Sequence, residues 1–192
     1  MTSAEAFEKG RTFTAFLDAV EANSGLWHTL PNRVTLHGES VMRIAAVPGR
    51  WRLLVLADDW CGDAVNILPV IAGLADAAPN LTLRILGREE VPEVMDRHLT
   101  HGTRSIPVAI LLDEKGKERG WWGPRPRVLQ EWFEVVARTL EVPHRYPALR
   151  RWYARDRGES TCKEIADLIW CGAYGGAEVY HGTRPCKGAR AA

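Results

Sequence analysis

The order of apolar segments predicts an α/β protein with a mixed four-stranded sheet flanked by helices. Two short apolar runs, at 51–57 and 81–86, lie on either side of a segment with helical periodicity. That order is typical of parallel strands joined by a right-handed crossover. A third run at 106–112 is followed by a turn and a returning segment at 117–122, which indicates an antiparallel hairpin.

Residues 1–37 are expected to form a helical extension at the N-terminus. Apolar side chains recur there at the spacing of one helix face, which predicts a helix over 3–22 that ends at Asn23-Ser-Gly25. Residues 26–36 show no such period, so we expect them to be irregular.

Residues 38–142 are expected to form the central domain. Its predicted helices alternate with the four strands and cover residues 38–46, 61–77, 90–99 and 127–140. The short strand at 51–57 is apolar without alternation, which is typical of a strand covered on both faces, and the strand at 106–112 has Pro107 as its second residue.

Residues 143–170 are expected to form a helical arm at the C-terminus. Within it, Ser160-Thr161 followed by Glu164 predicts a capping box at the start of the last helix. Residues 171–192 are rich in glycine and alanine and have no period, so we expect a mobile tail there.

The charge balance argues against several classes of protein. With 25 Lys and Arg against 24 Asp and Glu in 192 residues, the net charge is +1, whereas nucleic-acid-binding domains are usually strongly basic. No apolar stretch reaches the ~18 residues of a membrane helix, and the N-terminal segment does not resemble a secretory signal. We therefore expect a cytoplasmic protein with neither a nucleic-acid nor a membrane partner.

The cysteines have to be considered one at a time. They are Cys61, Cys162, Cys171 and Cys186, too few for a disulfide scaffold and without a Cys-x-x-Cys pair. The last three are also too widely spaced for typical zinc ligands, so neither a metal nor another cofactor is expected.

Cys61 is the strongest candidate for chemistry, because it lies where a predicted strand ends and a predicted helix begins. Unpaired N–H groups and the helix dipole favour the nucleophilic thiolate at such a position. The carboxylate of Asp63 opposes ionisation, unless that residue caps the helix, and the sequence leaves open which influence dominates. Asp58 and Asp59, just before, fit either a structural cap or a proton carrier.

The motif Trp60-Cys61-Gly62-Asp63, followed by Ile106-Pro107 at the start of a strand, resembles the thioredoxin family over residues 38–140. More narrowly, it resembles a bacterial thioredoxin-like subfamily. The resemblance implies a thioredoxin fold in which Cys61 is the attacking cysteine and Trp60 packs beside it. It also implies that Pro107 is the cis-proline beside which the backbone of Ile106 docks an extended substrate.

Three positions depart from the family pattern. Asp63 stands where the motif has proline, Ala64 where it has the resolving cysteine, and Val55 where thioredoxins place a buried aspartate. A dithiol cycle cannot run at this site alone. Resolution would need a second free thiol, for which Cys162 is the internal candidate.

Two functions are compatible with these residues. In the first, the protein is a monothiol oxidoreductase, and Cys61 attacks a disulfide of a protein or of a low-molecular-weight thiol. In the second, Cys61 is a buried relic and the protein is a non-redox binding or scaffold module that uses the cis-proline groove. The groove residues in either case are Trp60, Gly62, Asp63, Ile106 and Pro107.

Two features lie outside this site. Trp121 and Trp122 cannot both face the core, since successive strand side chains alternate, so one is expected to be covered by Trp152 and Tyr153 or to face a partner. Several arginines could hold an anionic substrate, although no spacing demands it: Arg125, Arg127, Arg150 and Arg151.

Overall fold

The computed structural model describes residues 1–175 and 180–181 and contains one mixed sheet with the strand order β2-β1-β3-β4-β5. The strands are β1 (Trp51–Leu56), β2 (Leu81–Leu86), β3 (Val108–Leu112), β4 (Glu118–Trp122) and β5 (Tyr180–His181). β1 and β2 are parallel, whereas β3 is antiparallel to both β1 and β4. The predicted four-stranded α/β fold is confirmed, and the two-residue β5 extends it by pairing parallel to β4.

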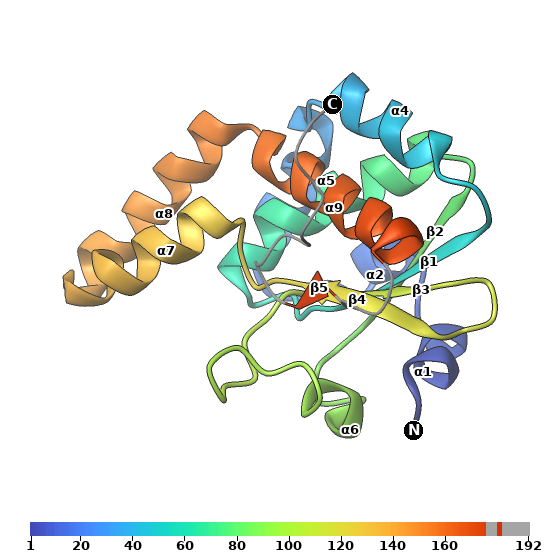
Figure 1. The fold of residues 1–192 in the computed structure, drawn as a ribbon. Helices are drawn as coiled ribbons and strands as arrows, with labels where there is room; N and C mark the ends of the chain where they lie inside the picture. The colour runs from blue at the N-terminus through green and yellow to red at the C-terminus, as the bar shows by residue number, and fades with distance from the viewer. Residues whose placement is uncertain (176–179, 182–192) are drawn as a thin grey trace.

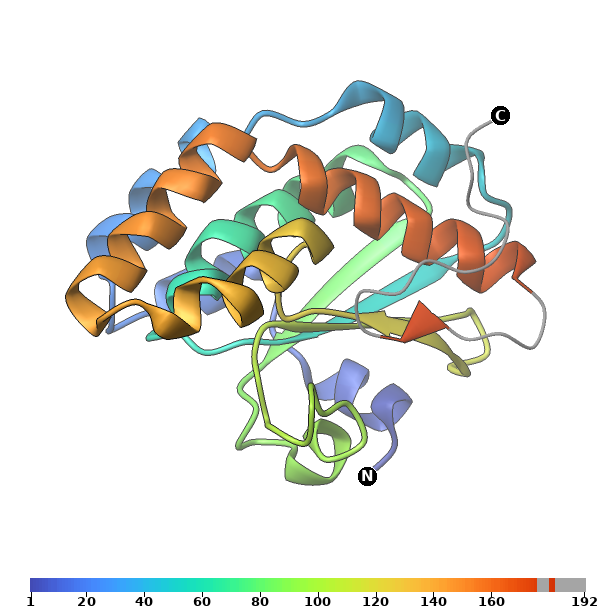
Figure 2. The ribbon, with the colours of Figure 1, turned by 60° about the vertical axis from the view of Figure 1, so that its left-hand side comes forward.

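Helices cover both faces of this sheet. Figures 1 and 2 show α5 (Gly62–Ala77) and α9 (Glu159–Tyr174) on one face and α1 (Ser3–Lys9) on the other. Every side chain of β3 and all but one of β1 are buried as a result. This double cover explains why the two central strands are apolar without alternation.

The remaining helices surround this core. They are α2 (Phe13–Asp18), α3 (Ser24–Thr29), α4 (Gly38–Ala46), α6 (Pro92–Met95), α7 (Arg127–Val135) and α8 (Val142–Asp156), with short 3-10 turns at Pro31–Arg33 and Ala137–Thr139. α4 packs against α9, while α7 and α8 lie side by side at one end of the molecule (Figure 1). α6 and α7 are both shorter than the periodicity predicts.

The prediction of one N-terminal helix over 3–22 is wrong. The chain leaves the helical conformation at Gly10, where an added Cβ would lie 2.6 Å from the Cβ of Arg84. Arg11 then exchanges two backbone hydrogen bonds with Ile85 of β2, at 2.8 and 2.9 Å. Pairing with an otherwise open sheet edge therefore replaces the middle turns of the predicted helix. The segment 26–36, expected to be irregular, instead contains the end of α3 and a 3-10 turn.

The predicted capping box in the C-terminal arm is also wrong. The N-cap of α9 is Gly158, at φ +84°, and Glu164 lies one turn further along the helix. Its carboxylate accepts hydrogen bonds from Trp122 Nε1 at 2.6 Å and from the backbone N–H of Arg127 at 2.9 Å. Burial raises the pKa of Glu164 to about 7. The residue thus joins α9 to the sheet instead of closing its own helix.

The last helix is longer than predicted. α9 continues to Tyr174, so residues 171–174 are helical and not part of a tail. The helix lies so close to the sheet that a Cβ at Gly172 would come within 2.5 Å of Leu111 Cδ2. The rest of the predicted tail, apart from β5 and Gly175, lies outside the described residues.

Both terminal segments share one hydrophobic core with the sheet. The buried core includes Phe7, Phe16 and Trp27 from the N-terminal extension and Ile165 and Leu168 from the arm. The domain boundaries predicted near residues 37 and 142 remain predictions. No helix among the described residues has the length and apolar character needed to cross a bilayer.

Candidate functional site

The fold brings the two predicted motifs into contact. Cys61 is the N-cap of α5, at the end of the loop that follows β1, and Pro107 precedes β3, which pairs with β1. The Cys61 thiol donates a hydrogen bond to the carbonyl oxygen of Ile106, with Sγ and O separated by 3.4 Å. The Ile106–Pro107 peptide bond is cis. Cys61, Ile106 and Pro107 therefore form one site at the end of the two central strands.

Burial decides the ionisation of the thiol. Only 8% of Cys61 is exposed, and this burial, with the Asp63 carboxylate, raises its pKa to about 11. The backbone N–H groups of Ala64 and Asp63 lower the pKa but do not offset the rise. Burial and the Asp63 carboxylate together therefore outweigh the helix N-terminus and favour the neutral thiol.

Asp63 is the centre of a buried polar cluster. Its Oδ2 pairs with Arg125 Nη2 at 2.5 Å, and its Oδ1 accepts a hydrogen bond from the Tyr153 hydroxyl at 2.8 Å. Arg125 comes from the segment between β4 and α7, and Tyr153 comes from α8. The carboxylate therefore ties the first turn of α5 to two distant segments and does not cap its own helix.

Several contacts hold Arg125 toward Asp63. The guanidinium lies over the ring of Phe133, 3.9 Å from its centroid, and Nη1 donates to Gln130 Oε1 at 3.0 Å. The segment before Arg125 packs directly on the cis-proline loop, because a Cβ at Gly123 would lie 2.3 Å from the Pro107 carbonyl oxygen. These contacts restrict the movement of the Arg125 guanidinium.

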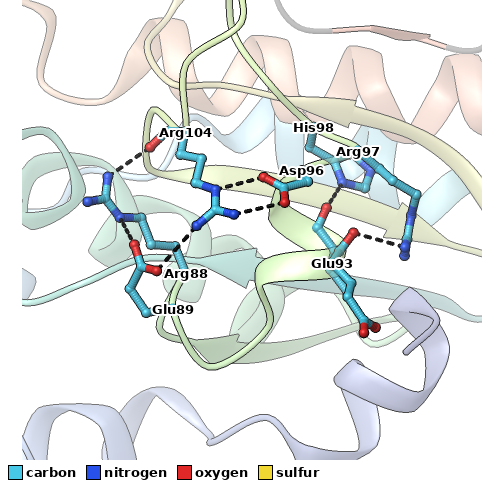
Figure 3. Close-up of polar contacts among 8 residues, drawn as sticks. Arg88, Glu89, Glu93, Asp96, Arg97, His98 and Arg104 are labelled. Carbon is cyan, nitrogen blue, oxygen red and sulfur yellow. Dashed lines mark hydrogen bonds and ion pairs between the residues drawn. The ribbon is translucent and has the colours of Figure 1, made fainter.

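Polar contacts connect the segment that leads into Ile106 with the residues around α6 (Figure 3). Arg104 pairs with both carboxylate oxygens of Asp96, at 2.7 and 2.8 Å, while its carbonyl oxygen accepts from Arg88 Nη1 at 2.8 Å. The Arg88 guanidinium also lies 5.0 Å from the ring centroid of Trp60. Trp60 itself is 53% exposed, so its indole forms an open edge of the site.

The two aspartates before the motif have different surroundings. The side chain of Asp59 accepts from the backbone N–H groups of Glu21 and Ala22, at 2.8 and 2.7 Å, and its carbonyl oxygen accepts from Trp27 Nε1 at 2.8 Å. Asp59 therefore anchors the N-terminal extension. Burial raises the pKa of Asp58, although Arg88 lies 3.8 Å away.

The adjacent tryptophans are covered differently from the prediction. Trp122 is buried under α9 and donates to Glu164, whereas Trp121 lies edge-on to His98 with ring centroids 5.8 Å apart. Trp152 and Tyr153 were expected to cover one of these two tryptophans. They instead pack edge-on against each other, with ring centroids 5.4 Å apart.

A pocket of about 480 Å³ adjoins the thiol site. It lies between α3, the first turns of α5 and α8, and it shares Gly62 and Tyr153 with that site. Sequence patterns did not indicate it, because its walls come from three segments far apart in the chain. Among the described residues, no group of three or more His, Cys, Asp or Glu side chains is placed to hold a metal ion.

Known proteins provide an independent comparison. A solved structure of a protein of unknown function from Pseudomonas aeruginosa is 24% identical, with a TM-score of 0.71, over 90% of this chain and 99% of that one. An HIV epitope-scaffold protein is 23% identical, with a TM-score of 0.70, over 90% and 99% of the two chains. At these identities the likeness shows the fold alone, and comparison with curated proteins finds no match. The thioredoxin family model matches residues 10–139, so the chain belongs to the thioredoxin family.

Proposed function

We propose that this protein is a non-redox binding protein built on the thioredoxin fold. The observation that carries the proposal is the state of the Cys61 thiol, which is 8% exposed and donates its hydrogen to the carbonyl of Ile106. With a pKa of about 11, only about one thiol in ten thousand would be ionised at neutral pH. Disulfide exchange needs the thiolate, so this site is poorly suited to attack a disulfide.

The lack of a resolving thiol near Cys61 in the sequence supports the same conclusion. Ala64, fully buried, stands where the family motif has its second cysteine. Cys162 is also fully buried, in α9, where burial raises its pKa. Its role as an internal resolver remains a prediction that no contact in the described residues supports.

The pocket beside α5 is a better ligand site than the cis-proline groove. In the groove, the Ile106 carbonyl that would dock a substrate chain already accepts the Cys61 thiol. The lining of the pocket is largely apolar, as that of small-molecule sites usually is. We therefore propose a small-molecule ligand, in place of a disulfide substrate, as the partner of this protein.

Alkylation of Cys61 tests the proposal. The full chain is treated with iodoacetamide from neutral to alkaline pH, and peptide mass spectrometry locates the label, with Cys61→Ser identifying the peptide. We expect slow labelling of the native protein, an apparent pKa near 11, fast labelling after unfolding, and no adduct with oxidised glutathione. Fast labelling at neutral pH with a pKa below ~8.5 would refute the proposal and restore the monothiol alternative.

A further inference from the structure

We propose that the pocket between α3, α5 and α8 binds a small amphipathic anion, with an apolar body and a carboxylate or phosphate head group. This inference rests on the proposed binding function and names the class of ligand. The volume of about 480 Å³ lies within the roughly 300–1,000 Å³ that is usual for small-molecule sites.

The interior wall of the pocket is apolar. The residues that form it are Leu26, Leu30, Val34, Val65, Pro69 and Val70. They come from α3, the segment after it and one face of α5, so apolar surface reaches the pocket from two independent directions. Such a wall favours a ligand whose body is hydrocarbon, because burying it removes apolar surface from water on both sides.

The wall formed by α8 and its C-cap residue, Arg157, carries positive charge. Arg150, Tyr153, Ala154 and Arg157 line the pocket at the spacing of a single helix face. Both arginines are exposed, and among the described residues neither is paired with a carboxylate. By contrast, Arg145 on the same helix is bonded to the carbonyl groups of Ala137, Arg138 and Leu140.

The two side-chain amides that line the pocket already have hydrogen-bond partners within the protein. The side-chain amide of Asn66 donates to the Gly62 carbonyl at 2.8 Å, and that of Asn23 donates to the Asp59 carbonyl at 3.1 Å. No Asp or Glu is among the residues that line the pocket. The available charge is therefore cationic, and guanidinium groups bind carboxylates and phosphates through paired hydrogen bonds.

Calorimetric titration of the full chain tests this ligand class. The probes are octanoate and octyl phosphate below their micelle concentrations and octanol below its solubility limit, with acetate as a head group without a body. Both octyl anions should bind, octanol about tenfold more weakly or worse, and acetate not measurably, because binding needs the body and the charge together. Binding of only one octyl anion would also support the proposal and would identify the head group.

Variants at exposed positions of α8 and at its C-cap connect binding to this pocket. The double variant Arg150→Gln/Arg157→Gln should weaken octanoate about tenfold or more, and Ala154→Trp should block the pocket with a bulky ring. Arg151 is exposed and does not line the pocket, so Arg151→Gln and Arg151→Trp are the matched controls and should bind as the wild type does. Thermal unfolding verifies that each variant is folded.

Three results would overturn the proposal: no binding of either octyl anion, equal binding of octanol, or unchanged binding in the double variant. Its failure can be told apart from failure of the proposed function. An unreactive Cys61 without anion binding would refute the ligand class alone. A reactive Cys61 with anion binding would refute the non-redox function and leave the pocket intact.

Discussion

Replacing Arg125 with glutamine should destabilise the protein by about 3 kcal/mol, because it leaves the Asp63 carboxylate buried without its counter-ion. The two side chains are 13% and 11% exposed, and the charged atoms are 2.5 Å apart. Removing one member of a buried ion pair usually costs roughly 3–5 kcal/mol. We expect the lower end of that range, because the Tyr153 hydroxyl still donates to Asp63.

The assay is equilibrium unfolding in urea, followed by tryptophan fluorescence at neutral pH. Arg127→Gln is the matched control, because Arg127 forms an ion pair with Glu131 at 3.4 Å in which the side chains are 52% and 62% exposed. Such an exposed pair should contribute no more than about 0.5 kcal/mol. The two variants make the same substitution in a buried and in an exposed ion pair. The difference between their losses in unfolding free energy therefore measures the effect of burial.

A double-mutant cycle isolates the Asp63–Arg125 interaction. Asp63→Asn alone leaves the Arg125 guanidinium without a carboxylate, whereas Asp63→Asn/Arg125→Gln removes both charges. The double variant should be more stable than the sum of the single effects predicts, by about 2 kcal/mol. If Arg125→Gln destabilises the protein no more than Arg127→Gln does, or if the cycle shows no coupling, the reasoning about the buried cluster is refuted.

Two further variants test other contacts. The pKa of Glu164, raised from 4.5 to about 7, favours the folded state below pH 4.5, and this advantage is lost as pH rises toward 7. As pH rises over that interval, the free energy of unfolding of Glu164→Gln should therefore increase by up to about 3 kcal/mol relative to that of wild type. Urea unfolding at each pH measures this change. A difference between the two proteins that stays constant with pH would contradict the assignment. Gly123→Ala should lower stability by about 3 kcal/mol, since its Cβ would lie 2.3 Å from the Pro107 carbonyl oxygen at a φ of +135°. Gly25→Ala, with nothing within 4 Å of its Cβ, should leave Tm unchanged or raise it, and equal Tm values for the two alanine variants would argue against the close approach.

Local patterns in the sequence determined the four main strands, the long helix after Cys61 and the hairpin after Pro107. These elements are recoverable because hydrophobic period and turn residues act over a few neighbouring positions. The pairing of Cys61 with Ile106 and Pro107 followed from resemblance to a known family. The break at Gly10 did not, because it depends on an edge strand that lies about seventy residues further along the chain.

Only the tertiary structure decided the chemistry of Cys61. The sequence places a helix N-terminus and Asp63 beside the thiol, but the pKa of the thiol depends mainly on how deeply it is buried. The partners of Asp63 are Arg125 and Tyr153, which no local pattern connects to Cys61. The pocket has the same origin, since three separate segments form its walls. Solvent exposure and charge separation are properties of positions in space, so the sequence identified the residues of the site and the fold determined what they can do.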